Sequence, residues 1–376
     1  MKVRLDPARL RGTVRVPTSK SLLHRHLICQ ALAGEYEAPP PEAEDVQYTV
    51  RALEALRCGE ARIDCGMSGS TLRFLLPLAM ARGQVGATFT GDERLLTRPI
   101  GALLPMERTA SGWRVTGRLT PGSYRLTADE TSQTLSGLMM ALPLLDAPSK
   151  IMLTTKPVSK PYLDMTLAVM ARHGVSIEEK AGGYIVPAPQ SYRKYAFTPE
   201  GDWSAAAWYT VMNALQGQEI TVENIVRPSL QGDSRIADYV NSNADKFDLS
   251  ATPDLLPPLA LWAVLRRNRV TRFSHVGFLR GKESDRLRNT ARILNALGGC
   301  VREETDGLTV IGAEKLHGGA AVDGHRDHRM VMLAAFAAVL CEKSVTLTGA
   351  EFADKSYRAF WRDYISLGGK MEVLKP

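Results

Sequence analysis

Six segments of this chain are apolar at nearly every position and begin with a polar residue. Residues 74–80 (Phe-Leu-Leu-Pro-Leu-Ala-Met) and 332–337 (Met-Leu-Ala-Ala-Phe-Ala) are typical. A helix that is apolar all round is buried, whereas a surface helix keeps one polar face. The polar starts lie near Ser21, Ser70, Ser132, Ser204, Asp254 and His328. The sequence therefore predicts six buried helices that the rest of the fold has to cover.

A second kind of segment alternates with the first. It is an amphipathic helix that ends at a small residue or turn and runs into a short strand. Clear copies occupy residues 52–59, 167–174, 293–299 and 364–369, and weaker ones lie near residues 103–112 and 236–247. Glycine just after the last periodic residue is a helix C-cap signal. The two kinds alternate over roughly 50 to 75 residues, a period that indicates repeated supersecondary units. We expect six units of two helices plus strands, three in each half.

Composition limits the class of protein. A chain of 376 residues fits two domains, and 44% hydrophobic with 23% charged residues is ordinary for globular proteins. The longest apolar stretches, such as residues 255–265, are too short to cross a bilayer, and the start lacks the apolar core of a signal peptide. Five cysteines without a C-x-x-C pair favour reduced thiols and argue against structural zinc. We expect a cytoplasmic protein with no membrane segment.

The net charge of +7 indicates an anionic partner. Nucleic acid and a small phosphorylated substrate are the two candidates. The basic residues are scattered rather than gathered into runs, and only 7% of the chain is aromatic. This pattern disfavours a nucleic-acid surface.

The starts of the buried helices carry more than capping residues. Each helix N-terminus leaves unpaired N–H groups and a partial positive charge, so converging starts form an anion site. Ser, Thr and Asp at such places are ordinary N-caps. Lys20, Gln133 and Arg329 are not, and the two cations, Lys20 and Arg329, oppose the helix dipole at its N-terminus. The helix starts therefore favour anion binding.

Ten short motifs, read in order, give the chain a resemblance to a known family. They start at Ser19-Lys20-Ser21, Ser68-Gly69-Ser70-Thr71-Leu72-Arg73, Thr90-Gly91-Asp92, Thr131-Ser132-Gln133, Ser159-Lys160-Pro161-Tyr162, Gln231-Gly232-Asp233, Pro253-Asp254, Lys282-Glu283-Ser284-Asp285-Arg286, Asp327-His328-Arg329 and Asp354-Lys355-Ser356. In this order and spacing the chain resembles the 5-enolpyruvylshikimate-3-phosphate synthase family of enolpyruvyl transferases over nearly its whole length.

The resemblance implies a fold. It is an inside-out α/β barrel of two similar domains, each built from three βαβαββ repeats with buried central helices. One domain would run from residue 19 to residue 230. The other would combine residues 1–18 with residues 231–376.

The resemblance also implies a reaction. The enolpyruvyl (carboxyvinyl) group of phosphoenolpyruvate moves to the 5-hydroxyl of shikimate 3-phosphate by addition and elimination, and phosphate is released. The two substrates bring four anionic groups, which need several cations and many N–H or O–H donors. Because Lys and Arg supply these cations, we expect no cofactor and no metal. We expect a monomer whose only partners are the small-molecule substrates, and glyphosate as a competitor of phosphoenolpyruvate.

Site residues follow from the resemblance, motif by motif. Shikimate 3-phosphate would be held by Lys20, Ser21, Arg25, Thr131, Ser132, Gln133, Ser159, Tyr162, Asp254 and Lys282. Phosphoenolpyruvate would be held by Lys20, Gly69, Arg98, Gln133, Arg286, Arg329 and Lys355. Asp254 would take the hydroxyl proton and Glu283 would protonate C3, with Lys20, Lys282 and His328 nearby to move protons or stabilise charge.

Three other readings stay open. The sister family that transfers enolpyruvate to UDP-N-acetylglucosamine usually has a cysteine in a mobile loop before an Arg-Pro pair. Here residues 91–97, before Arg98-Pro99, contain no cysteine. A nucleic-acid-binding module would need the dispersed cations but not Asp254 and Glu283. A trimmed, inactive relative is the third.

Overall fold

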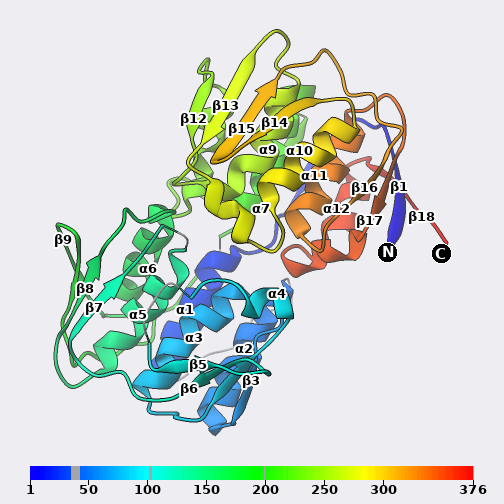
Figure 1. Cartoon of the computed structure of the whole chain (residues 1–376). Coiled ribbons are helices and arrows are strands. Elements are labelled where there is room, and N and C mark those ends of the chain that lie inside the picture. The colour runs from blue at the N-terminus through cyan, green and yellow to red at the C-terminus, as the bar shows by residue number, and fades with distance from the viewer. Residues whose placement is uncertain (35–42, 101–103, 130, 199, 218, 376) are drawn as a thin grey trace. The chain divides into compact units, whose positions relative to one another are not determined.

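The computed structural model describes residues 1–34, 43–100, 104–129, 131–198, 200–217 and 219–375. The chain forms two compact units. The discontinuous unit joins Met1–Ser19 to Glu200–Pro376, and the inserted unit is Lys20–Pro199. Figure 1 shows the chain from one end to the other.

The boundary expected at residue 230 lies about thirty residues too late, since the discontinuous unit resumes at Glu200. Two contacts explain this difference. Strand β11 (Ile220–Val222) pairs in parallel with β2 (Gly12–Val14), and helix α7 (Trp203–Gln216) packs on α9 (Leu256–Val264). Both contacts tie residues after Pro199 to the N-terminal segment and to the second half of the chain. The first boundary lies at Ser19/Lys20, one residue from the expected position.

Four sheets of four strands share one topology, in which the first two strands are parallel and the next two pairings are antiparallel. In the inserted unit their order is β3 (Arg62–Asp64), β4 (Thr88–Thr90), β6 (Trp113–Val115), β5 (Met106–Arg108), and β7 (Ser123–Leu126), β8 (Ser149–Leu153), β10 (Gly183–Val186), β9 (Glu178–Lys180). In the discontinuous unit it is β12 (Lys246–Asp248), β13 (Val270–Ser274), β15 (Gly307–Ile311), β14 (Cys300–Glu304), and β16 (Ala321–Asp323), β17 (Val345–Thr348), β1 (Lys2–Asp6), β18 (Lys370–Val373).

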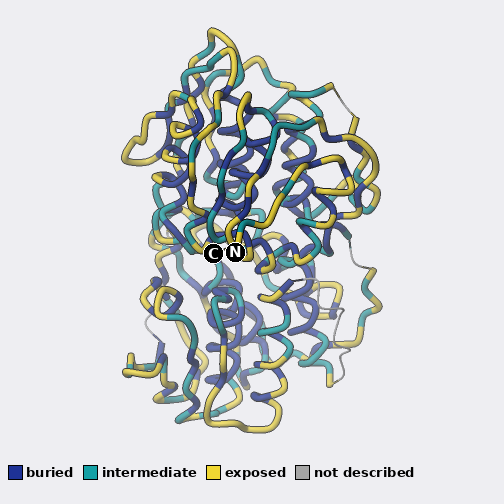
Figure 2. The backbone as a smooth tube through the Cα atoms, turned by 90° about the vertical axis from the view of Figure 1, so that its right-hand side faces the viewer, coloured by how far each residue is buried: buried dark blue, intermediate teal, exposed yellow. Residues whose placement is uncertain are grey.

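The six buried helices are confirmed. They are α1 (Lys20–Leu32), α3 (Gly69–Ala81) and α5 (Gln133–Ala141) in the inserted unit, and α7, α9 and α11 (His328–Val339) in the discontinuous unit. Their residues form the cores because no face is polar enough to meet water, as the dark interior of Figure 2 shows. Gly137 lets α5 approach α3, since a Cβ there would lie 2.2 Å from the Arg73 carbonyl oxygen.

The amphipathic helices are confirmed at the four clear positions. They are α2 (Glu44–Cys58), α6 (Lys160–Arg172), α10 (Arg286–Ala296) and α12 (Phe360–Ser366). The weak copy near residues 236–247 is only the short helix α8 (Ile236–Val240) followed by β12. The weak copy near residues 103–112 is wrong within the described residues, because Met106–Arg108 pairs with Trp113–Val115 as a hairpin. Its first residue lies outside the described part of the chain. A further short helix, α4 (Glu93–Leu96), follows β4.

Within the residues that the structure describes, each unit contains two full βαβαββ repeats and one reduced repeat. The full repeats run from β3 to β6, from β7 to β10, from β12 to β15, and from β16 to β18, where β1 supplies the sixth element. The third repeat of the discontinuous unit has only the parallel pair of β2 and β11 with α7 and α8. In the inserted unit, α1 and α2 account for the described residues 20–34 and 43–58 without a strand. The expectation of three full repeats per unit is therefore met by two.

Polar residues stand at the N-terminal ends of the buried helices. Two short 3₁₀ helices adjoin buried helices, since η1 (Leu142–Leu144) follows α5 and η3 (Pro253–Leu255) precedes α9. Three others, η2 (Gly232–Arg235), η4 (Gly277–Gly281) and η5 (Ala350–Lys355), come before α8, α10 and α12. None of the helices in the described part of the chain is long and apolar enough to cross a membrane.

Candidate active site

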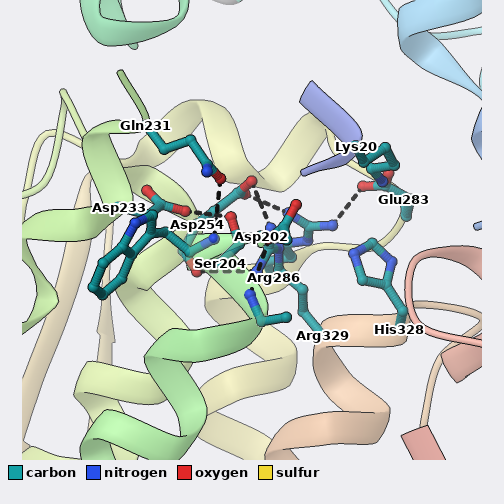
Figure 3. A network of polar contacts seen from close by, with 12 residues as sticks. Lys20, Asp202, Ser204, Gln231, Asp233, Asp254, Glu283, Arg286, His328 and Arg329 are labelled. Atoms are coloured by element: carbon teal, nitrogen blue, oxygen red, sulfur yellow. Dashed lines mark hydrogen bonds and ion pairs between the residues drawn. The ribbon is translucent and has the colours of Figure 1, made fainter. Parts of the chain in front are cut away.

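In the discontinuous unit, the charged residues at the helix starts form one network around Arg286, the first residue of α10 (Figure 3). The Arg286 guanidinium is only 3% exposed and donates to three carboxylates. Nε lies 2.8 Å from Asp327, Nη1 lies 2.9 Å from Asp254, and Nη2 lies 2.7 Å from Glu283. A buried guanidinium needs such partners, since an unpaired buried charge is strongly unfavourable.

Two more cations close the network. Arg329 on α11 donates from Nη2 to the second oxygen of Asp254 at 2.7 Å, and Lys355 at the end of η5 lies 3.1 Å from Glu283. Each of the two carboxylates thus has two cationic neighbours. Five of the residues predicted from sequence, namely Asp254, Glu283, Arg286, Arg329 and Lys355, are brought together here.

Asp254 is held strongly in its ionised form. Burial raises its pKa, but the charges of Arg329, Arg286 and Lys282 outweigh that effect and bring the pKa to about 2. Burial also lowers the pKa of Arg286, and Asp327, Glu283 and Asp254 raise it above its ordinary value. In this state the carboxylate of Asp254 is a weak base, because both of its oxygens neutralise arginines.

His328 and Lys282 border the same network. His328 opens α11 and is buried, with Nδ1 3.7 Å from the carboxylate of Asp327. Lys282 follows η4, and its Nζ lies 5.8 Å from the centre of the Phe278 ring. Lys282 contributes to the field that lowers the pKa of Asp254.

In the inserted unit, a second group of predicted residues surrounds the start of α3. A Cβ on Gly69 would lie 3.1 Å from Arg98 Nη1 and 3.1 Å from Gln133 Oε1, so both side chains pass close to this backbone. Gln133 donates to Ser70 Oγ at 3.1 Å and accepts from Arg73 Nη1 at 3.0 Å. The N-termini of α3 and α5 therefore bring Gly69, Arg98 and Gln133 close together.

The N-terminal halves of α1 and α6 carry a third group of predicted residues. Lys20 begins α1 and pairs with Asp45 of α2 at 2.8 Å. Arg25 joins α1 to α6, donating to Thr166 Oγ1 at 2.7 Å and to the Tyr162 carbonyl at 2.9 Å. Its third short contact is the carbonyl of Ser21 at 2.7 Å. Arg25 is thus engaged within its own unit.

Three predicted hydroxyl residues lie at helix starts, Ser132 and Ser159 as N-caps and Thr131 one residue before the N-cap of α5. Ser132 precedes α5 and Ser159 precedes α6, both buried and neither closing a side-chain cap bond. The hydroxyl of Thr131 accepts from the Gln133 N–H at 3.2 Å. Ser159 has a φ of 57°, a left-handed conformation that is uncommon for serine and that turns the chain sharply into α6.

The comparisons with known proteins agree with these motifs. A family model described as EPSP synthase (3-phosphoshikimate 1-carboxyvinyltransferase) matches residues 57–245 and 239–364. A 3-phosphoshikimate 1-carboxyvinyltransferase of Clostridium kluyveri is 34% identical over 421 aligned positions, covering 98% of this chain and 98% of that protein. The chain belongs to the EPSP synthase family. A second such relative, from Clostridium acetobutylicum, is also 34% identical and covers 98% of this chain and 97% of its own length.

Solved structures share the fold. The EPSP synthase of Acinetobacter baumannii superposes with a TM-score of 0.77 at 19% identity and covers 100% of both chains. The enolpyruvyl transferase NikO of Streptomyces tendae gives a TM-score of 0.71 at 18% identity, covering 99% of this chain and 98% of its own. At such identities the likeness concerns the two-domain α/β fold.

Three further buried residues stand out that sequence reasoning did not assign, Arg73 in the inserted unit and Asp233 and Asp327 in the discontinuous unit. Asp327 is fully buried, binds Arg286 and also accepts from Ser284 Oγ at 3.0 Å and from the Arg329 N–H at 2.9 Å. Arg73 donates twice to the Pro99 carbonyl, at 2.9 and 2.7 Å. Asp233 accepts from Ser204 Oγ at the start of α7. All three stand inside the quoted motifs, which was the available signal.

Asp233 differs electrostatically from Asp254. Its side chain is buried, and one carboxylate oxygen has no hydrogen-bond partner among the described residues. Burial, and after it the negative charge of Asp254, raise the pKa of Asp233 to about 7, although Arg329 and Ser204 oppose the rise. At neutral pH this carboxyl group holds its proton for much of the time.

This difference predicts a pH dependence of stability. Asp233 binds a proton in the folded state up to about pH 7, whereas in the unfolded chain it loses it near the ordinary value of 3.8. Stability from this group therefore falls as the pH rises from about 4 to 7. Asp254 acts in the opposite direction and only below about pH 4, because its folded pKa is about 2.

We expect Asp233→Asn to flatten the fall in unfolding free energy between pH 5 and pH 8 by about 1 kcal/mol or more. Urea denaturation at both pH values measures it. The exposed Asp238→Asn is the matched control for removal of a carboxylate and should follow wild type. If the unfolding free energy changed equally between pH 5 and pH 8 in wild type, Asp233→Asn and Asp238→Asn, Asp233 would be ionised in the folded state.

Proposed function

We propose that this protein transfers the enolpyruvyl group of phosphoenolpyruvate to the 5-hydroxyl of shikimate 3-phosphate, forming 5-enolpyruvylshikimate 3-phosphate and phosphate. The observation that carries the proposal is the network in which Asp254 and Glu283 share Arg286 and each contact a further cation. Two carboxylates among anion-binding cations are what an addition–elimination on a phosphorylated enol needs. Relatives at 34% identity carry the name of this activity.

We assign phosphoenolpyruvate to Arg286, Arg329 and Lys355 together with Lys20, Gly69, Arg98 and Gln133. We assign shikimate 3-phosphate to Lys20, Ser21, Arg25, Thr131, Ser132, Gln133, Ser159, Tyr162, Asp254 and Lys282. The burial of Ser132 and Ser159 at helix N-caps supports this, since both hydroxyls lack a cap bond. We further propose that the protein acts as a cytoplasmic monomer and that the repeats of each unit close as an inside-out α/β barrel.

The charge pairing suggests how the base is activated. In this network Arg286 and Arg329 neutralise both oxygens of Asp254, which keeps its pKa at about 2. When the phosphate and carboxylate of phosphoenolpyruvate bind these two arginines, Asp254 loses part of that stabilisation and its pKa rises. The carboxylate then becomes a competent base for the substrate 5-hydroxyl at the moment both substrates are bound.

Glu283 takes the role of acid at C3 in the same way. Arg286 and Lys355 stabilise its charged form at 2.7 and 3.1 Å. Engagement of both cations by the incoming anion raises the proton affinity of Glu283, so that it can carry the proton that C3 receives. Lys20, Lys282 and His328 would move protons or stabilise charge beside it.

The test of the function is phosphate release from phosphoenolpyruvate with two alternative acceptors. We expect release with shikimate 3-phosphate and none with UDP-N-acetylglucosamine, and an unchanged rate in the presence of a chelator. Release with the second acceptor alone would assign the protein to the sister activity. No release with either would indicate an inactive relative, and a rate restored only by a divalent ion would overturn metal-free catalysis.

Asp254→Asn and Glu283→Gln should each lower kcat by about 10²–10⁴-fold and change either KM much less, because proton transfer acts in the transition state. Steady-state kinetics in both substrates measure this. The exposed Asp238→Asn serves as control. Variants with near-normal kcat and poor KM would move both carboxylates to a binding role.

Gly69→Ala should weaken glyphosate more than phosphoenolpyruvate. The added methyl would lie 2.8 Å from Arg73 Nη1, which Gln133 and the Pro99 carbonyl hold in place, so the side chain cannot retreat freely. Overpacking of this kind costs about 1–3 kcal/mol, and glyphosate, the longer molecule, fills the space more completely.

The test is to measure the glyphosate inhibition constant and the phosphoenolpyruvate KM in wild type and in Gly69→Ala. Gly122→Ala is the control, because a Cβ there meets nothing within 4 Å. Equal losses for the two ligands, or a wild type indifferent to glyphosate, would remove Gly69 from the site.

A further inference from the structure

A buried chain of hydroxyl groups links α1 to the first turn of α3. His24 Nδ1 lies 2.7 Å from Thr49 Oγ1, which lies 2.6 Å from Thr71 Oγ1, which lies 2.7 Å from Ser68 Oγ. The three hydroxyl residues have 0% of their surface exposed and His24 has 1%. Ser68 is the N-cap of α3, and the chain therefore ends directly beside Gly69.

Counting protons gives this chain a direction. Ser68 Oγ accepts from the Thr71 N–H at 3.2 Å and from the Thr71 hydroxyl. The one proton of the Thr71 hydroxyl goes to Ser68 at 2.7 Å, with the Asp45 carbonyl farther away at 3.5 Å. Thr71 must therefore accept from Thr49, and Thr49 has no proton left for His24. His24 therefore donates from Nδ1. The remaining ring nitrogen, Nε2, has no hydrogen-bond partner among the described residues, as suits a nitrogen without a proton.

The environment of His24 keeps the ring neutral. Burial, only partly offset by the charge of Asp45, lowers its pKa to about 3. A neutral imidazole has a single N–H, so occupation of Nδ1 fixes the tautomer. The edge of the ring faces Phe74 at 6.4 Å between centroids, in a T-shaped arrangement.

The proton count directs this chain toward the start of α3. The Ser68 hydroxyl accepts twice from Thr71 and is 0% exposed, so its part is to hold the first turn of the helix. We propose that His24 is a positioning residue: as the Nδ1–H tautomer it acts through Thr49 and Thr71 to hold the first turn of α3, and with it the backbone at Gly69, in place for the anion bound there. The anion is phosphoenolpyruvate, so this inference rests on the proposed function.

A capping role alone does not explain the chain. Ser68 can cap α3 by itself, whereas Thr49 and His24 add buried polar groups that each need a partner. His26, two residues further along α1 and therefore on the other side of the helix, is the contrasting case. Its Nδ1 meets His173 Nε2 at 3.1 Å, and its ring stacks on Phe197 at 3.6 Å. His26 thus packs toward the end of α6 and makes no hydrogen bond to α3 in the described part of the chain.

The test compares variants at these two histidines. His24→Leu and Thr49→Val should raise the KM of phosphoenolpyruvate about tenfold, with kcat and the KM of shikimate 3-phosphate within about threefold of wild type. His24→Asn should restore the KM, because an amide N–H can occupy the place of Nδ1–H. His26→Leu, a matched loss of a buried histidine on α1, should lower stability and leave this KM unchanged.

A second measurement reads the chain without substrate. The ¹⁵N spectrum of the wild-type protein should show His24 protonated at Nδ1 alone, and the Thr71 amide should exchange faster in His24→Leu than in wild type. An Nε2–H tautomer, a failure of His24→Asn to restore the KM, or an equal rise in His26→Leu would overturn the proposal. A wild type that releases no phosphate would instead refute the proposed function. The tautomer of His24 in the ¹⁵N spectrum would still test the direction of the hydrogen-bond chain, because that measurement needs no substrate.

Discussion

A helix that is apolar on every side can place polar groups only at its ends. Six helices of this chain are of that kind, and their burial forms the cores of both units. The unpaired N–H groups of their first turns must then meet side chains or ligands. Ser68, Asp202 and Asp327 each close a side-chain cap at one of these starts. Much of the buried polar chemistry of the protein is therefore concentrated at these ends.

The network around Arg286 shows what this concentration costs. Burying a guanidinium and three carboxylates is unfavourable unless each charge is paired, and here every one of them has a partner within 3.1 Å. The pairing stabilises the ligand-free protein, but it also occupies the groups that the proposed reaction needs. Anionic substrates compete with Asp254 and Glu283 for the same cations, so ligand binding and a change in proton affinity are one electrostatic event.

Sequence alone predicted what depends on local pattern. The buried helices near Ser21, Ser70 and Asp254 follow from their apolar runs, and the motifs named Asp254, Arg286 and Arg329 as site residues, which the structure brings into contact. What it missed depends on contacts far apart along the chain. The pairing of β2 with β11 moved a domain boundary, and the link from His24 to Thr71 joins three helices. The weak helix signal near residues 103–112 failed because a hairpin partner decided the conformation of Met106–Arg108.

Strand β1 lies between β17 and β18, with Val3 opposite both Leu347 and Val373. These partners are separated along the chain by the whole inserted unit and most of the discontinuous one. During synthesis, Lys2–Asp6 leaves the ribosome long before either neighbour exists, so this sheet cannot close until the last strand has emerged. The inserted unit contains all strands of its own sheets, so it can finish folding while β1 is still unpaired. The order of translation thus makes the first strand the last to be paired.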